Sequence, residues 1–350
     1  MPMNEDKKRN ISLQTDAQVP ETEDDAIFNI SLRPQNFTEF IGQAESIANL
    51  KVAIVAAKQR QEYLEHVLLS GPPGLGKTSL AQIIAHEMGS KITATSGPAI
   101  ERAGDLIGIL TNLGKGDVLF IDEIHRLSKV VEEFLYPAME NFHIDFIIDK
   151  GPYAKTIKFN LKPFTLVGAT TRSGLLSGAL RDRFGLIYHL DFYNYKDLSL
   201  ILRNSAGQLG IQIDKDASLE IARRSRGTPR IANRLLRRIR DYAQVQSRDG
   251  IDLELVDCAS KALGVDCAGL DEFDRRFLKV ILKNYAGGPV GIEALAASLN
   301  EDAGTIIDTV EPYLLKAGYL KRTSRGRFAT EEAFKHFDLP YSKEKQQEIF

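Results

Sequence analysis

The sequence predicts an α/β fold: a parallel sheet with a phosphate-binding loop, followed by a helical lid and a C-terminal winged helix. Three observations support this prediction. Short apolar runs alternate with helical patterns over residues 27–193, which is typical of a parallel sheet covered on both faces. Residues 194–264 show only helical patterns. Residues 265–350 show three helical patterns before a basic hairpin. Residues 1–26 are polar and lack periodicity, so we expect a flexible tail there.

In the first domain, the strands should be formed by continuous apolar runs of five residues each. These runs are His66–Ser70, Asp117–Ile121 and Phe164–Gly168. In the lid, Thr228 and Pro229 are typical of the cap and the first residue of a helix that continues to Gln246.

In the third domain, amphipathic patterns predict helices over Asp271–Tyr285, Gly291–Leu299 and Asp302–Lys316. Pro312 cannot donate a backbone hydrogen bond, so it should interrupt the last of these helices. Residues 319–328 then predict a two-stranded wing.

The composition is that of an ordinary globular protein, with 43% apolar and 26% charged residues among 350. No run approaches the ~18 apolar residues that a membrane helix needs. The N-terminus is polar, so we expect a cytoplasmic protein that has no membrane partner. Cys258 and Cys267 fit no disulfide, zinc or redox pattern, and we expect both to be small core residues.

Basic residues are concentrated in two segments, although the net charge of the chain is −2. Residues 221–250 carry nine arginines and two acids. Residues 319–327 carry Lys321, Arg322, Arg325 and Arg327 and no acid. Local basic patches of this kind indicate contact with phosphate groups.

A phosphate-binding loop is indicated by the run GPPGLGKT, from Gly71 to Thr78, which fits the pattern GxxxxGK[ST]. Its glycines let backbone N–H groups surround a phosphate. Lys77 should neutralise phosphate charge, and Thr78 should bind Mg²⁺. The candidate nucleotide-binding residues of this segment are Gly71, Gly74, Gly76, Lys77, Thr78 and Ser79.

Two acids, Asp122 and Glu123, follow an apolar strand about 45 residues after the loop. Carboxylates at that position are costly unless they face a ligand or metal. We expect Asp122 to hold Mg²⁺ through water and Glu123 to be the base that activates the attacking water. A surface acid pair is the alternative. Thr171 follows the next strand and should contact the γ-phosphate or the water, unless it caps a local turn.

Arginines near residues 180–184 and at the start of the lid helix are further candidates. Arg183, or less favourably Arg181, is expected to be an arginine finger that reaches the γ-phosphate of a neighbouring subunit. An internal pair with Asp182 is the alternative. Arg230 could sense nucleotide from its own chain, or be structural.

Taken in this order, the motifs resemble those of the AAA+ ATPases, and within them the RuvB family of Holliday-junction branch-migration motors. The resemblance covers residues 27–340. Its supporting segments are residues 32–34, 40–43, 120–127, 168–172, 226–238 and 287–291.

The resemblance implies a homohexameric ring that uses ATP and Mg²⁺ to pump DNA. It also implies that the ring works with RuvA at four-way junctions, and with RuvC in the resolving complex, during recombination and repair. It places Arg322 and Arg327 on DNA. The sequence departs from the usual pattern at Asn141, where an acid is expected. Further residues that the resemblance places at the nucleotide are Leu32, Arg33, Glu140, Asn141, Phe142, Tyr193 and Arg230.

A projecting hairpin is predicted by two alternating segments, residues 143–149 and 156–161, on either side of Gly151 and Pro152. Alternation should place Ile144, Phe146 and Ile148 on one face, with Ile157 and Phe159 on the same side. That apolar face could pack on its own domain. The resemblance favours docking of the mobile C-terminal domain of RuvA.

Two other functional classes share parts of this pattern. An AAA+ initiator or loader also joins this ATPase to a winged helix, but acts as an ATP-switched DNA-binding platform. The hairpin segment favours the motor over that class. A P-loop kinase for a small molecule would leave the arginine-rich lid and the wing without a role.

Overall fold

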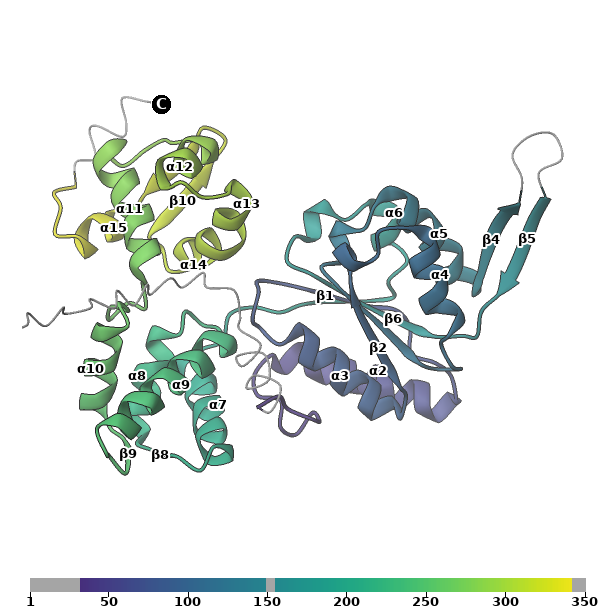
Figure 1. Ribbon diagram of the computed structural model, residues 1–350, viewed down its shortest axis with the longest axis horizontal. Coiled ribbons are helices and arrows are strands. Elements are labelled where there is room, and N and C mark those ends of the chain that lie inside the picture. The colour runs from purple at the N-terminus through teal and green to yellow at the C-terminus, as the bar shows by residue number, and fades with distance from the viewer. Residues whose placement is uncertain (1–31, 149–154, 342–350) are drawn as a thin grey trace, which may run out of the picture.

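The computed structural model describes residues 32–148 and 155–341, except for the side chains of 146–148 and 155–157. Its centre is a parallel five-stranded sheet with the order β2-β3-β6-β1-β7 (Figure 1). The three strands expected from the sequence are confirmed, and two more complete the sheet. The strands are β1 (Val67–Ser70), β2 (Ile92–Ser96), β3 (Val118–Asp122), β6 (Thr165–Thr170) and β7 (Leu186–His189). The predicted tail at residues 1–26 lies outside the described residues.

Helices cover both faces of this sheet, as the continuous apolar strands predicted. Alternate residues of one strand enter different cores: Val67 and Leu69 join the cluster on one face, and Leu68 joins the other. In Figure 1, α2 and α3 lie on one face and α4, α5 and α6 on the other. These helices are α2 (Ala44–Arg60), α3 (Lys77–Met88), α4 (Ala103–Thr111), α5 (Lys129–Asn141) and α6 (Gly178–Arg181).

The predicted hairpin is present and projects from the domain that contains the five-stranded sheet (Figure 1). It consists of β4 (His143–Ile148) and β5 (Lys155–Asn160), paired antiparallel. The register pairs Ile144 with Phe159 and residue 146 with residue 157, so the backbone places these positions on one face. The expected turn at residues 151–152 lies outside the described residues.

The lid is helical, as expected, with one short parallel strand pair added. Its longest helix starts at Pro229, as predicted. The Thr228 side chain does not cap that helix, because its hydroxyl donates to the carbonyl of Arg226 at 3.1 Å. The elements are α7 (Tyr195–Gln208), β8 (Gln212–Ile213), α8 (Lys215–Arg224), α9 (Pro229–Val245), β9 (Gly250–Ile251) and α10 (Leu253–Ala262).

The C-terminal part has the helices and hairpin of a winged helix, with its own apolar core. Pro312 does interrupt the third predicted helix. A π-helical turn replaces regular α-helix just before it. The elements are α11 (Glu272–Asn284), α12 (Ile292–Leu299), α13 (Ala303–Thr305), the π-helical turn η4 (Ile306–Val310), α14 (Glu311–Lys316), β10 (Leu320–Thr323), β11 (Gly326–Ala329) and α15 (Glu331–His336).

The lid and the winged helix are joined by a buried ion cluster. Arg226 pairs with Asp271 and with Asp274, the latter at 2.5 Å, and its Nε donates to the carbonyl of Gly269 at 2.9 Å. Burial raises the pKa of Asp274, and the Arg226 guanidinium opposes that shift. Separating these buried groups would leave charges without a partner inside the protein, so the cluster fixes the winged helix to the lid.

Two other expectations concerned the burial of the cysteines and the absence of a membrane helix. Cys258 and Cys267 are both exposed, so the prediction that they are core residues is wrong. Each cysteine sits at a position that faces solvent, which spacing in the sequence does not reveal. Among residues 32–148 and 155–341, no helix combines the length and the apolar character needed to span a membrane.

Candidate functional site

The phosphate-binding loop connects β1 to α3 and requires glycine for two reasons. Gly71, Gly74 and Gly76 all have positive φ, a region that side chains rarely adopt. A Cβ at Gly74 would also lie 2.8 Å from the Thr228 side chain and 2.9 Å from the Arg230 Cβ. The loop therefore packs directly against the lid. Within the described part of the chain, no side chain caps α3, so its first amides point into the loop, as phosphate binding needs.

A cavity of about 610 Å³ opens at this loop, between the sheet edge and the lid. It brings together most of the residues that the sequence and the resemblance proposed for the nucleotide. The cavity offers oxygen ligands for Mg²⁺, because Thr78, Asp122 and Glu123 all line it. The predicted residues that line it are Leu32, Arg33, Gly74, Gly76, Lys77, Thr78, Ser79, Asp122, Glu123, Thr171, Tyr193 and Arg230.

Sequence reasoning missed the lid wall of this cavity. Arg203, Asn204 and Gln208 line it from α7, and Asn233 lines it from α9. These residues belong to ordinary amphipathic helical patterns. Only the packing of the lid over the loop turns their polar faces toward the cavity, so no motif in the sequence distinguishes them.

Lys77 is buried at the start of α3. Its ammonium donates to the carbonyls of Gly71 at 2.8 Å and Pro72 at 2.9 Å. Burial lowers the pKa of Lys77 to about 8, although the nearby charges of Asp122 and Glu123 oppose the shift. The two carbonyls are neutral acceptors, so a phosphate group would be a stronger partner for this cation.

The candidate base Glu123 is engaged by two neighbours. Its Oε2 accepts from the Thr171 hydroxyl at 3.1 Å and lies 3.3 Å from His125 Nδ1. The His125 ring also lies 2.9 Å from the Thr170 hydroxyl. Burial lowers the pKa of His125, and the nearby Glu123 carboxylate opposes that shift. No motif in the sequence assigns His125 to the site.

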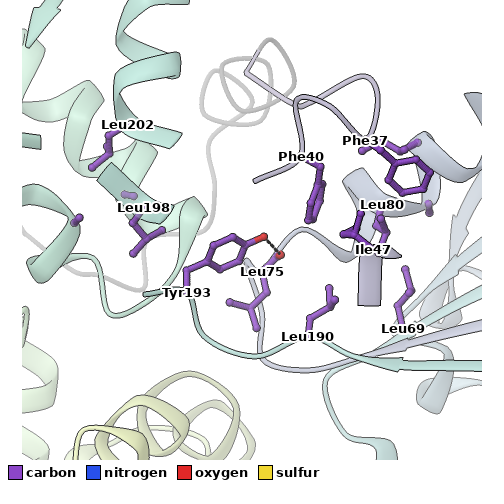
Figure 2. Close-up of a cluster of buried hydrophobic side chains, with 14 of the residues drawn as sticks. Phe37, Phe40, Ile47, Leu69, Leu75, Leu80, Leu190, Tyr193, Leu198 and Leu202 are labelled. Atoms are coloured by element: carbon purple, nitrogen blue, oxygen red, sulfur yellow. Dashed lines mark hydrogen bonds between the residues drawn. The ribbon is translucent and has the colours of Figure 1, made fainter. Parts of the chain in front are cut away.

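Tyr193 ties the loop to the lid. Its hydroxyl donates to the carbonyl of Leu75 at 3.3 Å, and Figure 2 shows the ring between the phosphate-binding loop and Leu198 of α7. Phe40 stands opposite, close to the position where a Cβ on Gly76 would lie. Burial raises the pKa of Tyr193, so the hydroxyl stays protonated.

Arg183 lies outside the residues that line the cavity of its own chain. Its guanidinium pairs with Glu140 at 2.8 Å, donates to the carbonyl of Ala179 and lies 4.3 Å from the centre of the Tyr136 ring. These contacts hold the side chain at the surface beside α5. Arg181, the last residue of α6, is exposed two positions before Arg183.

Residues 140–142 do not line the cavity of their own chain, so their expected approach to a nucleotide stays a prediction. Glu140 is held by Arg183 and Asn141 is exposed. Phe142 packs edge-on against Tyr63 at 5.0 Å and Phe164 at 5.8 Å, because the chain turns there from α5 into β4.

The wing departs from the expectation of uncompensated positive charge. The hairpin itself carries no acid, but the buried Glu311 of α14 pairs with Arg327 at 2.6 Å and with Arg322 at 3.8 Å. Arg327 is itself buried and its guanidinium donates to Glu311, so its expected contact with DNA stays a prediction. Arg322 keeps 55% of its side chain exposed and stays a candidate for DNA contact.

The hairpin also differs from expectation at its base. Ile144 is fully buried in the core of the sheet domain, so this structure does not expose it to a partner. It lies at the start of β4, where the strand still packs on its own domain. Phe159, which pairs with it, is 48% exposed. The side chains of Phe146 and Ile148 lie outside the described residues.

Family models match nearly the whole described chain. The Holliday junction DNA helicase RuvB P-loop domain matches residues 32–190, the RuvB AAA lid domain 193–266 and the RuvB C-terminal winged helix domain 267–338. The chain is 53% identical, over 340 residues, to the Holliday junction branch migration complex subunit RuvB of Desulfosudis oleivorans, covering 96% of this chain and 99% of that protein.

Solved structures agree with this similarity. The Thermotoga maritima RuvB Holliday junction branch migration motor superposes with a TM-score of 0.83 at 52% identity, covering 89% of this chain and 100% of that one. A single-residue variant of the Thermotoga protein superposes with a TM-score of 0.84 at 52% identity, covering 89% of this chain and 99% of that one.

The lowered pKa of Lys77 predicts that nucleotide affinity depends on pH. Because that pKa is about 8 in the free protein and phosphate favours the charged form, ATP binding should take up a proton above pH 8. Affinity for ATP should then fall as pH rises through 8, by up to about tenfold per pH unit. Titration of a fluorescent ATP analogue between pH 7 and 9.5 measures this. Lys77→Arg stays charged and should give a flatter profile; equal slopes in both proteins would contradict the assignment.

Proposed function

The chain belongs to the RuvB family of Holliday junction DNA helicases, and from this premise we propose that it moves four-way DNA junctions as a homohexameric ring with RuvA. It is an ATP-driven branch-migration motor, and the RuvB-type match extends over all three domains. That extent favours the motor over an initiator platform or a small-molecule kinase. RuvC would join the ring and RuvA in the resolving complex.

The observation that carries the proposal is the convergence of the phosphate-binding loop, the two acids and Thr171 in one cavity beneath the lid. Lys77 would bind the β- and γ-phosphates, and Arg230 would contact the nucleotide from the lid. Thr78 and Asp122 offer oxygen ligands for Mg²⁺, which supplies charge stabilisation of the phosphates when bound. Glu123 would accept a proton from the attacking water.

In the structure, the Glu123 carboxylate is engaged by Thr171 and His125. We propose that the Thr171 hydroxyl turns to the γ-phosphate when ATP binds, which removes one of the two contacts to Glu123 Oε2. Hydrolysis would then wait for the nucleotide. The same hydroxyl would serve both states, so a single residue links occupancy of the site to activity of the base.

Replacing Glu123 tests the central part of this proposal. Glu123→Gln keeps the shape of the side chain and removes its basicity, so ATP should still bind while hydrolysis falls by about 10²-fold or more. Branch migration of a synthetic four-way junction with RuvA should stop in parallel. Near-normal turnover in the variant would exclude Glu123 as the base, and normal turnover without junction movement in the unmodified protein would exclude the motor.

The position of Arg183 outside its own cavity predicts a shared active site. Arg183→Ala should bind ATP and hydrolyse it poorly, and Lys77→Ala should also hydrolyse it poorly for lack of phosphate contact. Mixed rings should recover part of the activity, because some interfaces then combine an intact loop with an intact finger. Steady-state hydrolysis across mixing ratios measures this. No recovery, with mixing verified by native mass spectrometry, would indicate that Arg183 acts within its own chain.

The two wing arginines should behave differently. Arg322→Ala should weaken duplex binding at all sequences and lower the salt dependence by about one charge, since Arg322 is exposed. Arg327→Ala leaves the buried Glu311 with only the more distant Arg322, so it should lower the stability of the winged helix by about 3–5 kcal/mol. Salt titrations of duplex affinity and thermal melting separate these effects. An unchanged salt slope in Arg322→Ala would argue against phosphate contact.

The hairpin is proposed as the docking site for RuvA, with Phe159 as its exposed apolar residue. Phe159→Asp should abolish RuvA binding and leave basal ATP hydrolysis intact. Lys158→Asp is the matched control, because the neighbouring residue of the same strand faces the other side. Pull-down with RuvA measures both. Equal loss in the two variants would implicate charge rather than the apolar face, and retained binding by Phe159→Asp would remove the hairpin as the docking site.

A further inference from the structure

Arg172 connects the ATPase core to the winged helix. It directly follows Thr171, and its guanidinium crosses to η4 and α13 of the third domain. Its Nε and Nη2 bind the two carboxylate oxygens of Asp308, each at 2.5 Å, and Nη2 also donates to the carbonyl of Gly304 at 3.1 Å. A two-point guanidinium–carboxylate contact fixes direction as well as distance.

On the ATPase side, Arg172 belongs to the hydrogen-bonded group around the candidate base. Its backbone N–H donates to the Thr170 hydroxyl at 3.0 Å. That hydroxyl lies 2.9 Å from the His125 ring, and the ring lies 3.3 Å from Glu123. A continuous series of contacts therefore runs from the winged helix to the carboxylate that would activate water.

On the DNA side, Asp308 lies three residues before Glu311 in the same interrupted helix. Glu311 holds Arg327 and contacts Arg322, the exposed arginine of the wing. In the segment from Ala303 to Lys316, the Asp308 carboxylate thus contacts the ATPase core, and the Glu311 carboxylate contacts the wing. A displacement of the wing would move both ends of this segment.

The contact of Arg172 is also of a kind that can be released. About a third of each side chain is exposed, 30% for Arg172 and 33% for Asp308. The cluster of Arg226, by contrast, is buried and keeps the winged helix on the lid. The buried cluster keeps the winged helix bound to the lid, whereas the partly exposed Arg172–Asp308 pair can break. The winged helix and the lid can therefore move together away from the core.

We propose that Asp308 is a positioning residue that restrains ATP hydrolysis: through Arg172 it holds the end of β6 where Thr171 and His125 engage Glu123. Contact of the wing with duplex DNA shifts the Ala303–Lys316 segment, releases Arg172 and frees the base. This inference rests on the proposed function. It assigns the coupling between DNA and hydrolysis to one ion pair within a single subunit.

The test compares ATP hydrolysis of the full chain with and without duplex DNA. Asp308→Ala should raise the basal rate about fivefold, the lower end of typical coupling effects, and leave the DNA-stimulated rate within about twofold. A gain in basal rate is not what damage to the fold produces. Asp308→Glu keeps the charge and should restore a low basal rate. Lys316→Ala removes another exposed pair of the winged helix, Lys316–Asp191 at 3.5 Å, and should change neither rate.

A double substitution completes the test. Arg172→Ala with Asp308→Ala should raise the basal rate no more than Asp308→Ala alone, because both remove one contact. An unchanged basal rate in Asp308→Ala, a parallel fall of both rates, or multiplying effects in the double variant would each overturn the proposal. If the unmodified protein shows no response to duplex DNA, the proposed function fails as well, and that outcome is recognised before any variant is compared.

Discussion

The buried ammonium of Lys77 is the constraint on which the arrangement of the site depends. A lysine can be charged there only if oxygen atoms surround it, and two backbone carbonyls of the loop do so in the free protein. Those carbonyls are available because the glycines let the loop curl back on itself. The same curl exposes the first amides of α3, so the lysine, the loop and the helix end all favour an anion at one place.

The parts of the fold that were predictable are those set by local sequence. Continuous apolar runs predicted three strands, and the loop pattern located the phosphate site, because both need particular residues at adjacent positions. Pro312 likewise interrupts its helix for a local reason. Strands β2 and β7 were missed since Ile92–Ser96 and Leu186–His189 are mixed in polarity, and only pairing with the central strands makes them strands.

The features that local sequence could not predict depend on which side chains meet across domains. Arg327 and Arg322 look alike in a basic segment, but Glu311 approaches from α14 and buries one of them. Ile144 belongs to an alternating strand, yet the first residues of that strand still pack on the core. Residues 140–142 form the end of helix α5 and its C-cap, yet lie away from their own cavity. In each case the deciding partner lies outside the local pattern.

Contacts of the lid connect the phosphate-binding loop to the winged helix. Gly74 packs against Thr228 and Arg230, so any shift of α9 reaches the phosphate-binding loop. Arg226, two residues before Thr228, fixes the winged helix to the same segment. A nucleotide that draws Arg230 inward must therefore carry the winged helix with it, since the buried charges of Arg226 and its acids cannot be separated without large cost. Lid closure and the position of the winged helix are therefore coupled through Arg226.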